Sequence, residues 1–306
     1  GVMEPQGLRG KAAIVGVGVA GMGEAPGYSY VELLAHAAKA AVADAGLTMK
    51  DIDGLCTANL DASMWPLNVV EYLKIRPKFV EGTNIGGSAF VSHLLPAMMA
   101  LEHGICNAVL VCYGTTQRTS TFGRKERTRA RGILDPSPFE SPYEPVNPPS
   151  SYALIAARHM YQYGTTRRHL AEVAVAARKW AQLNPEAFVR DPLTVEDALK
   201  ARMFSDPFSV LDCCLVTDGG AAFVMMRADR AKAQPKKPIY VLGAATAAWH
   251  RNVSGMDDLT VTPTKDAGAR AFAMAGMGPQ DMDVAQVYDA FTIKTILALE
   301  DLGFCK

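Results

Sequence analysis

The sequence predicts an α/β protein built from two related halves, and three observations carry this prediction. Continuous apolar runs such as ICNAVLVCYG at 105–114 are typical of central strands that are covered on both faces. These runs alternate with longer segments of helical periodicity such as residues 29–46. A short sequence pattern also recurs near the two ends of the chain, at 44–55 and 274–285.

The expected elements follow one another in a regular order up to residue 114. Gly46 and Gly104 stand where a helix commonly ends in a left-handed glycine. We expect strands within 11–21, 51–58, 76–84, 105–114, 217–226 and 237–249, and helices at 29–46, 88–104, 151–164 and 167–188.

Residues 115–150 break this pattern. The stretch 134–150 (LDPSPFESPYEPVNPPS) holds six prolines, which favours an ordered excursion or lid over a helix or central strand. The same region carries a basic cluster opposed by one acidic residue, Glu126. Its members are Arg118, Arg124, Lys125, Arg127, Arg129 and Arg131. Such a cluster is either solvated surface or a dock for a phosphorylated ligand or an acidic partner.

The recurring pattern indicates a duplication. DAGLTMKDIDGL (44–55) and MAGMGPQDMDVA (274–285) share Ala-Gly-apolar followed by Asp-apolar-Asp at equal spacing, and each follows a helix that follows a glycine-ended strand. The second copy is the shorter one, and we expect it to be incomplete at its C-terminal end. The predicted division is residues 1–114 with 206–232 as the first half, 115–205 as an inserted loop domain, and 233–306 as the second half.

Gly16, Gly18 and Gly21 in GVGVAG match the GxGxxG pattern of dinucleotide-binding loops. The expected helix does not begin at the third glycine, because MGEAPGYS intervenes, and the acidic residue sought further on, Asp44, falls inside a helix. We therefore expect these glycines to shape a tight loop near an active site rather than to bind a nucleotide.

Charge and composition exclude several classes of function. Thirty-one basic and 31 acidic residues give a net charge of zero, so no overall field favours nucleic acid or an anionic membrane. An apolar content of 49% fits a globular protein with a sizeable core. No apolar run approaches the length of about 20 residues that spans a bilayer, and no signal pattern begins the chain. We expect a cytoplasmic protein without a membrane span.

The six cysteines show no paired CxxC spacing, which argues against a metal site or a disulfide framework. Cys106, Cys112, Cys213 and Cys214 lie in apolar runs, where we expect buried thiols in a reducing compartment. Of the six histidines, His36, His103, His159 and His169 have charged neighbours on expected helices and are predicted to be exposed.

The stretch EGTNIGGSAF (81–90) is predicted to be a strand that turns sharply into a helix. Gly86, Gly87 and Ser88 at such a turn let a substrate approach the backbone, and they point amide groups at any anion held there. They would suit the oxygen of a thioester enolate. The alternative is that Ser88 is only an N-cap and the glycines only fit the turn.

Several strings resemble the thiolase superfamily, in its branch of sterol-carrier-protein-like lipid-transfer-protein thiolases. The most specific is VYDAFTIKTILALEDLGFCK at 287–306, with LDCCLVTDGGAA at 211–222 and LNP at 183–185. The resemblance covers nearly the whole chain. It implies a thiolase fold, a five-layer αβαβα arrangement of two βα halves, and a homodimer.

This family carries its nucleophilic cysteine three residues after an asparagine at the strand-to-helix turn. Counting from Asn84 puts that position at Gly87, and no cysteine occurs from 57 to 105. Ser88 is one residue out of register. Claisen-type acyl transfer requires an acyl-enzyme, which a glycine cannot form.

The same branch includes aldolases that lack the cysteine and use the tyrosine of a YD-x-F string. Here the string is Tyr288, Asp289, Ala290 and Phe291. The resemblance implies that Tyr288 is the acid/base group, that Ser88 and the turn glycines assist it, and that Asn84, His93, Asp289 and Phe291 bind substrate. Two alternatives stay open, a core tyrosine for Tyr288 and a satisfied interior histidine for His93.

The implied activity is retro-aldol cleavage of a β-hydroxyacyl-CoA with a steroid-like side chain to a ketone and a shorter acyl-CoA. Coenzyme A enters as part of the substrate, and we expect no separate cofactor and no metal. The resemblance also implies a small OB-fold, zinc-ribbon partner subunit. The alternatives are a thiolase-type acyltransferase with Cys213 or Ser88 as nucleophile, and a non-catalytic subunit that binds acyl-CoA or lipid.

Overall fold

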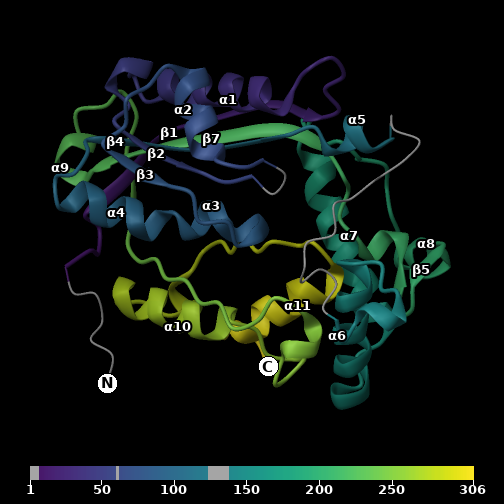
Figure 1. Ribbon diagram of the computed structural model, residues 1–306. Coiled ribbons are helices and arrows are strands. Elements are labelled where there is room, and N and C mark those ends of the chain that lie inside the picture. The colour runs from purple at the N-terminus through teal and green to yellow at the C-terminus, as the bar shows by residue number, and fades with distance from the viewer. Residues whose placement is uncertain (1–6, 60–61, 123–137) are drawn as a thin grey trace. The chain divides into compact units, whose positions relative to one another are not determined.

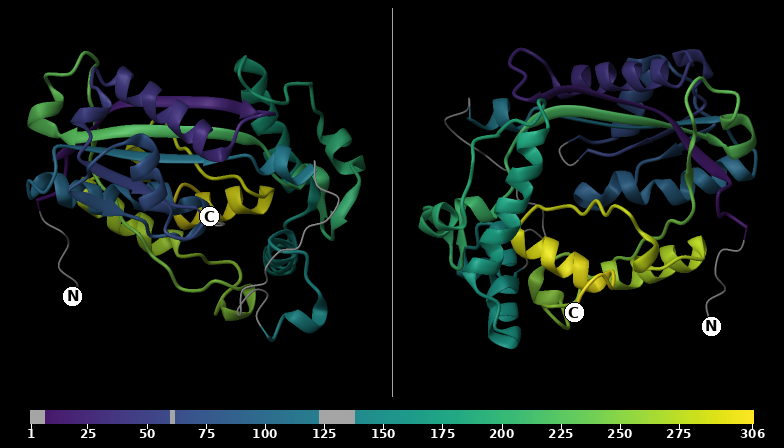
Figure 2. Two further views of the ribbon diagram at one scale, coloured as in Figure 1. Left: turned by 45° about the horizontal axis from the view of Figure 1, so that its top comes forward. Right: turned by 180° about the vertical axis from the view of Figure 1, so that it is seen from behind.

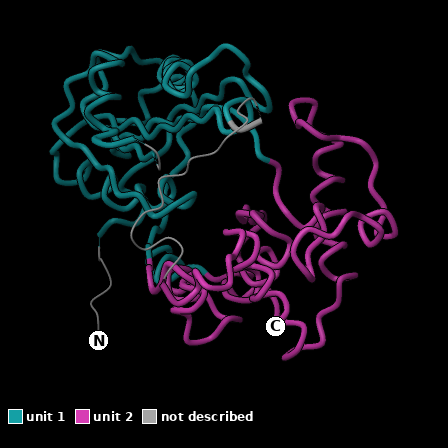
Figure 3. The backbone as a smooth tube through the Cα atoms, turned by 45° about the vertical axis from the view of Figure 1, so that its right-hand side comes forward, with its two compact units in different colours: residues 1–125, 216–246, 270–277 teal, residues 126–215, 247–269, 278–306 magenta. Residues whose placement is uncertain are grey.

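The computed structural model describes residues 7–59, 62–122 and 138–306 (Figure 1). The chain divides into two compact units (Figure 3). The first comprises residues 1–125, 216–246 and 270–277, and the second comprises 126–215, 247–269 and 278–306. The three-part division expected from the sequence stays a prediction.

The first unit is a six-stranded mixed sheet. Its strand order is β3-β2-β4-β7-β1-β8, with β2 parallel to β3 and β4 and with antiparallel pairing from β4 through β7 and β1 to β8. The strands are β1 (Ala12–Gly23), β2 (Gly54–Thr57), β3 (Phe79–Glu81), β4 (Ala108–Thr115), β7 (Asp218–Arg227) and β8 (Ile239–Val241). Each expected strand of this unit is confirmed.

Helices cover both faces of this sheet (Figures 1 and 2). They are α1 (Tyr30–Asp44) and α2 (Trp65–Leu73) on one face, and α3 (Ala89–Ser92) and α4 (Leu94–Glu102) on the other, with α5 (Gln117–Phe122) and α9 (Ala228–Ala231) after β4 and β7. Leu110 and Cys112 of β4 pack with α1 and α2, whereas Val109 and Val111 pack with α4. The apolar run in β4 is continuous because the strand is buried on both faces.

Gly16 and Gly18 lie inside β1, where α1 packs against the strand. A Cβ atom at Gly16 would lie 2.3 Å from the carbonyl oxygen of Ala41, and one at Gly18 would lie 2.4 Å from that of Ala37. Any side chain there would push the helix off the sheet. Gly16 and Gly18 therefore serve helix–sheet packing and do not form the expected tight loop. Gly21 also lies in β1, with φ of +60°, and a Cβ there would lie 2.5 Å from the Leu33 side chain of α1.

The two copies of the sequence repeat share local geometry. Gly46 and Gly276 follow α1 and α10 (Thr264–Ala275) with φ of 70° and 63°. In each copy a 3₁₀ turn follows, and its last residue, Asp51 or Asp281, accepts a hydrogen bond from the backbone N–H three residues earlier, at 2.7 and 2.8 Å. A Cβ at Gly243 would also lie 2.2 Å from a backbone oxygen of α10. The glycine spacing in both copies thus reflects close contact between a helix and the backbone beside it.

The second unit is mainly helical. Its elements are α6 (Pro149–Tyr163), α7 (Arg167–Leu183), α8 (Val195–Lys200), α11 (Thr292–Asp301) and the two short strands β5 (Met203–Ser205) and β6 (Phe208–Ser209). Leu170 of α7 and Ile293 and Leu297 of α11 pack around Phe208 in its core. Of the proline-rich stretch 134–150, residues 134–137 lie outside the described part, and residues 138–148 hold one 3₁₀ turn at Ser141–Tyr143 and no strand. Pro149 and Ser150 already belong to α6, so the expectation of no helix is wrong at the end of the stretch.

The basic cluster is described at one residue. Arg118 lies on α5, a short helix within the region 115–150 that was expected to be irregular. Its guanidinium pairs with Glu24 at 2.5 Å and donates a hydrogen bond to the carbonyl of Val216. The other basic residues, 124–131, lie outside the described residues.

The thiols differ from the expected pattern at two positions. Cys106 and Cys112 are buried as expected, but Cys213 is half-buried and Cys214 is exposed. Among residues 7–59, 62–122 and 138–306, no group of three or more potential metal ligands occurs. Within that same part of the chain, no helix has the length and apolar character needed to cross a membrane.

Gly18→Ala tests the packing of α1 on β1. The added methyl group meets backbone rather than a flexible side chain, so we expect the free energy of unfolding to fall by about 1–3 kcal/mol. Urea unfolding followed by circular dichroism measures the change. Gly255→Ala is the control, since its nearest contact would be the His250 Cβ at 3.6 Å. Equal midpoints for Gly18→Ala and the wild type would contradict this packing argument.

Candidate active-site residues

The turn after β3 has the predicted strand–turn–helix form. Gly86, Gly87 and Ser88 form a 3₁₀ turn that leads directly into α3. Gly86 adopts φ of +85°, a left-handed conformation that favours glycine. Ser88 is exposed, and its side chain makes no capping hydrogen bond to the helix. Ser88 therefore stands at the N-cap position of α3 without a capping hydrogen bond, and the choice between an N-cap role and a site role stays a prediction.

Asn84 holds this turn from within. Its side-chain oxygen accepts a hydrogen bond from the Gly86 amide at 3.1 Å, and its side-chain nitrogen donates to the carbonyl of Asn59 at 3.1 Å. The Gly86 amide is therefore engaged within the turn, and the predicted role of this turn as an anion site stays a prediction. The expected contact of Asn84 with substrate stays a prediction.

Glu81 ties the end of β3 to the following loop. Its carboxylate accepts hydrogen bonds from the backbone amide of Thr83, at 2.6 Å, and from the Thr83 hydroxyl. Partial burial raises the pKa of Glu81, but these hydrogen bonds outweigh burial and leave the pKa below its ordinary value, with His93 acting in the same direction. Ionised Glu81 thus fixes the approach to the turn.

His93 lies between α3 and α4 and is 1% exposed. Its Nε2 lies 3.0 Å from the Thr83 carbonyl oxygen, which can only accept, so Nε2 carries the proton and donates. Phe90 packs against the imidazole edge-to-face with ring centroids 5.9 Å apart. This geometry makes His93 an interior support for the turn, while its expected contact with substrate stays a prediction.

Tyr288 stands in the second unit, four residues before α11. Its side chain is 54% exposed, so the alternative of a core tyrosine is wrong. The Nζ atom of Lys294, in the first turns of α11, lies 5.4 Å from the centroid of the Tyr288 ring. Lys294 could not be predicted as a neighbour of Tyr288, because a spacing of six residues forms no recognisable motif.

The segment around Tyr288 is anchored on its C-terminal side. Phe291 is 5% exposed and stacks on Tyr152 at 4.5 Å and on Phe208 at 5.7 Å between ring centroids. The Thr292 hydroxyl donates to Asp212 at 2.8 Å. Phe291 thus packs in the core and holds the segment, and its expected substrate contact stays a prediction.

Asp289 and Cys214 are exposed neighbours of this segment. The amide of Cys214 donates to the carbonyl of Ala290 at 2.9 Å. Burial, with the charge of Asp289, raises the pKa of the Cys214 thiol. Asp289 therefore makes the surface beside Tyr288 acidic, and its expected role in substrate binding stays a prediction.

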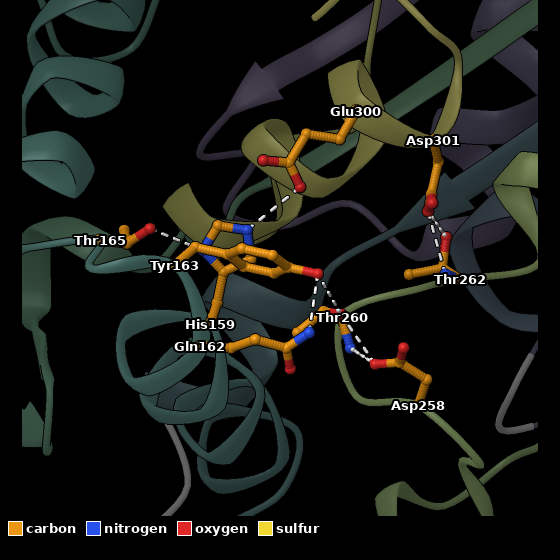
Figure 4. A network of polar contacts seen from close by, with 9 residues as sticks. All are labelled: His159, Gln162, Tyr163, Thr165, Asp258, Thr260, Thr262, Glu300 and Asp301. Carbon is orange, nitrogen blue, oxygen red and sulfur yellow. Dashed lines mark hydrogen bonds and ion pairs between the residues drawn. The ribbon is translucent and has the colours of Figure 1, made fainter. Parts of the chain in front are cut away.

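His159 is the one helix histidine whose predicted exposure is wrong, since it is 2% exposed (Figure 4). Its Nδ1 lies 2.7 Å from the Thr165 hydroxyl, and its Nε2 lies 3.1 Å from a carboxylate oxygen of Glu300. The contact with Glu300 joins α6 to the end of α11. No sequence pattern links these two residues, because they are 141 positions apart.

Residues 245–306 match the family described as thiolase C-terminal domain-like. The chain is 33% identical to a steroid side-chain-cleaving aldolase of Thermomonospora curvata, over 97% of this chain and 79% of that protein. It is 32% identical to a 17-hydroxy-3-oxo-4-pregnene-20-carboxyl-CoA lyase of Mycobacterium tuberculosis, over 97% and 80%.

An acetyl-CoA acetyltransferase of Methanothermobacter thermautotrophicus is also 32% identical, over 95% of this chain and 77% of that protein. The solved structure titled Ltp2-ChsH2(DUF35) aldolase matches with a TM-score of 0.87 and 32% identity, over 98% of this chain and 78% of that one. The chain belongs to the thiolase superfamily. Within it, the chain is similar to the thiolase-like aldolases, which confirms the predicted fold class and branch. The five-layer arrangement and the incompleteness of the second half stay predictions.

Glu81→Gln tests the anchoring of the turn. Because the folded pKa of Glu81 is lowered, its stabilisation is present above the ordinary value of 4.5 and is lost as pH falls through the folded pKa. The variant should be less stable than wild type at neutral pH and should lose less stability between about pH 5 and about pH 3. Urea midpoints across this range measure the difference. Glu71→Gln, on an exposed site of α2, is the control. A wild-type acid profile in Glu81→Gln would refute the anchoring role.

Proposed function

We propose that this protein is a carbon–carbon lyase that cleaves a β-hydroxyacyl-CoA with a bulky, steroid-like side chain by retro-aldol chemistry. The observation that carries this proposal is an exposed Tyr288 in a chain whose turn bears Gly87 where thiolases carry their nucleophilic cysteine. Similarity to a steroid side-chain-cleaving aldolase and to a CoA-ester lyase supports the reaction class.

Retro-aldol cleavage needs a base but no acyl-enzyme. Tyr288, as phenolate, takes the proton of the β-hydroxyl group, and the bond between Cα and Cβ breaks as the ketone forms. The electron pair of that bond moves into the thioester and gives an enolate. The enolate then takes a proton at Cα, which Tyr288 returns, and a shorter acyl-CoA leaves with the phenolate restored.

The enolate oxygen needs hydrogen-bond donors where its charge develops. The amide of Gly87, in the 3₁₀ turn before α3, is the proposed backbone donor, with the exposed Ser88 hydroxyl as a further one. Asn84 accepts a hydrogen bond from the Gly86 amide and His93 donates one to the Thr83 carbonyl, so both support the backbone at and just before this turn. Such donors must be held rigidly, because they stabilise the enolate only if they already point at its oxygen when the negative charge forms.

Coenzyme A is proposed as part of the substrate, with no separate cofactor. We also propose a homodimer, a cytoplasmic location and a small OB-fold, zinc-ribbon partner subunit. The aldolase structure whose title names a DUF35 partner supports the partner proposal. Co-expression with such a subunit, followed by size-exclusion chromatography, tests it.

Tyr288→Phe is the decisive variant for the lyase proposal. Loss of a positioned acid/base group should reduce cleavage of a β-hydroxyacyl-CoA by about 10²–10⁴-fold. Ketone and shortened acyl-CoA are quantified by mass spectrometry, with the partner subunit present. Tyr161→Phe, on an 83% exposed tyrosine of α6, should retain wild-type turnover. Full activity in Tyr288→Phe would remove Tyr288 from the mechanism, and tight CoA-ester binding by the wild type without cleavage would favour a non-catalytic binding subunit.

A thiolase-type acyltransferase is the second candidate, favoured by similarity to an acetyl-CoA acetyltransferase. Its nucleophile would be Cys213 or Ser88. Burial, with the charge of Asp212, raises the pKa of the Cys213 thiol to about 11, so about one thiol in a thousand is ionised at pH 8. Cys213 is therefore a poor nucleophile.

Cys213→Ala should leave cleavage within about twofold of the wild type, because no covalent intermediate is formed on it in the proposed reaction. The wild type mixed with an acyl-CoA should show no added acyl mass in intact-protein mass spectrometry. An acyl adduct that disappears in Cys213→Ala or in Ser88→Ala would establish the acyltransferase instead.

A further inference from the structure

A cation stands over the ring of Tyr288. Lys294 follows it by six residues, in the first turns of α11, and its backbone amide donates to the carbonyl of Phe291 at 2.9 Å. The Lys294 Nζ lies 5.4 Å from the centroid of the phenol ring, within the range of about 6 Å in which a cation and an aromatic face attract.

Lys294 keeps its positive charge available to the ring. Among the residues that the structure describes, no carboxylate forms an ion pair with it. Its side chain is half-buried, and burial lowers the pKa of its ammonium group while Asp301, two turns further along α11, opposes that effect. A partly desolvated ammonium group acts on a neighbouring charge more strongly than a solvated one.

We infer that Lys294 is a positioning residue for Tyr288, whose ammonium group stabilises the phenolate form of that tyrosine. This inference rests on the proposed function for its catalytic meaning. A phenol has an ordinary pKa of about 10, so about one in a thousand is ionised at pH 7. A nearby opposite charge lowers a pKa, and because the 5.4 Å separation is from the ring centroid and the ring is half-exposed, we expect a modest effect of about one unit.

The other charges nearby do not replace Lys294 in this role. Asp289, next to Tyr288 in the chain, is acidic and opposes the phenolate. Asp301 attracts Lys294 and is itself influenced by Lys265 and Glu300, and Glu300 pairs with His159 of α6. A half-buried lysine can also form an imine, but an imine forms with a ketone or aldehyde, and here the electrons of the broken bond enter a thioester. Lys294 thus acts as a charge rather than as a nucleophile.

Titration of Tyr288 tests the inference without any substrate. The ultraviolet absorbance change of phenolate formation is measured in the full-length protein, and the same titration in a Tyr288→Phe background is subtracted to isolate Tyr288. Lys294→Met, which keeps the length of the stem, should raise the Tyr288 pKa by about one unit, and Lys294→Arg should keep it near the wild-type value. An unchanged pKa in Lys294→Met, or an equal rise in both variants, would overturn the inference.

Kinetics provide the second measurement. The limb of the kcat profile that rises with pH should move about one unit higher in Lys294→Met, so kcat at pH 7 should fall about tenfold with little change in KM. Lys200→Met, which removes an exposed charge from α8, should leave the profile unchanged. A wild type that cleaves no substrate defeats the proposed function, whereas the titration still decides the role of Lys294, so the two failures are distinguishable.

Discussion

The arrangement of the first unit depends on close backbone contact between α1 and three strands of the sheet. Gly16 on β1, Gly114 on β4 and Gly220 on β7 all face α1, and a Cβ at any of them would lie 2.1–2.3 Å from a carbonyl oxygen of that helix. Removing side chains at these sites lets α1 rest directly on the sheet. The central strands are thereby fixed relative to α1, and β2 carries that order outward to β3 and to the turn that follows it.

The turn at 86–88 matters to the proposed function through its backbone. In that proposal Gly87 stands where thiolases carry a thiol, and a backbone amide stabilises an oxyanion only if its direction is fixed beforehand. The side chains of Asn84, Glu81 and His93 form hydrogen bonds with Asn59, Thr83 and Gly86. The backbone positions of residues 86–88 are therefore held by polar side chains that bond to the turn and to the loop before it.

Local patterns in the sequence predicted most of the fold. The apolar run of β4, the glycine at the end of α1 and the turn at 86–88 could be read because each depends on residues close in sequence. The misreadings have a common cause. Gly16 and Gly18 resemble a ligand-binding loop until their partners Ala41 and Ala37 are known. Likewise, the burial of His159 depends on Glu300, which no sequence spacing connects to it.

The same limit applies to the chemistry. Resemblance makes Tyr288 the proposed base, but an isolated tyrosine serves poorly as one, because its phenolate is scarce at neutral pH. A neighbouring positive charge raises the fraction of phenolate at neutral pH, and the charge beside Tyr288 comes from Lys294 in the helix that follows it. Phe291 and Thr292 lie between the two residues in the chain, and their contacts with Phe208 and Asp212 fix the start of α11. Because that anchor sets where Lys294 stands, the packing of an aromatic core residue governs the electrostatic environment of the exposed phenol three residues before it.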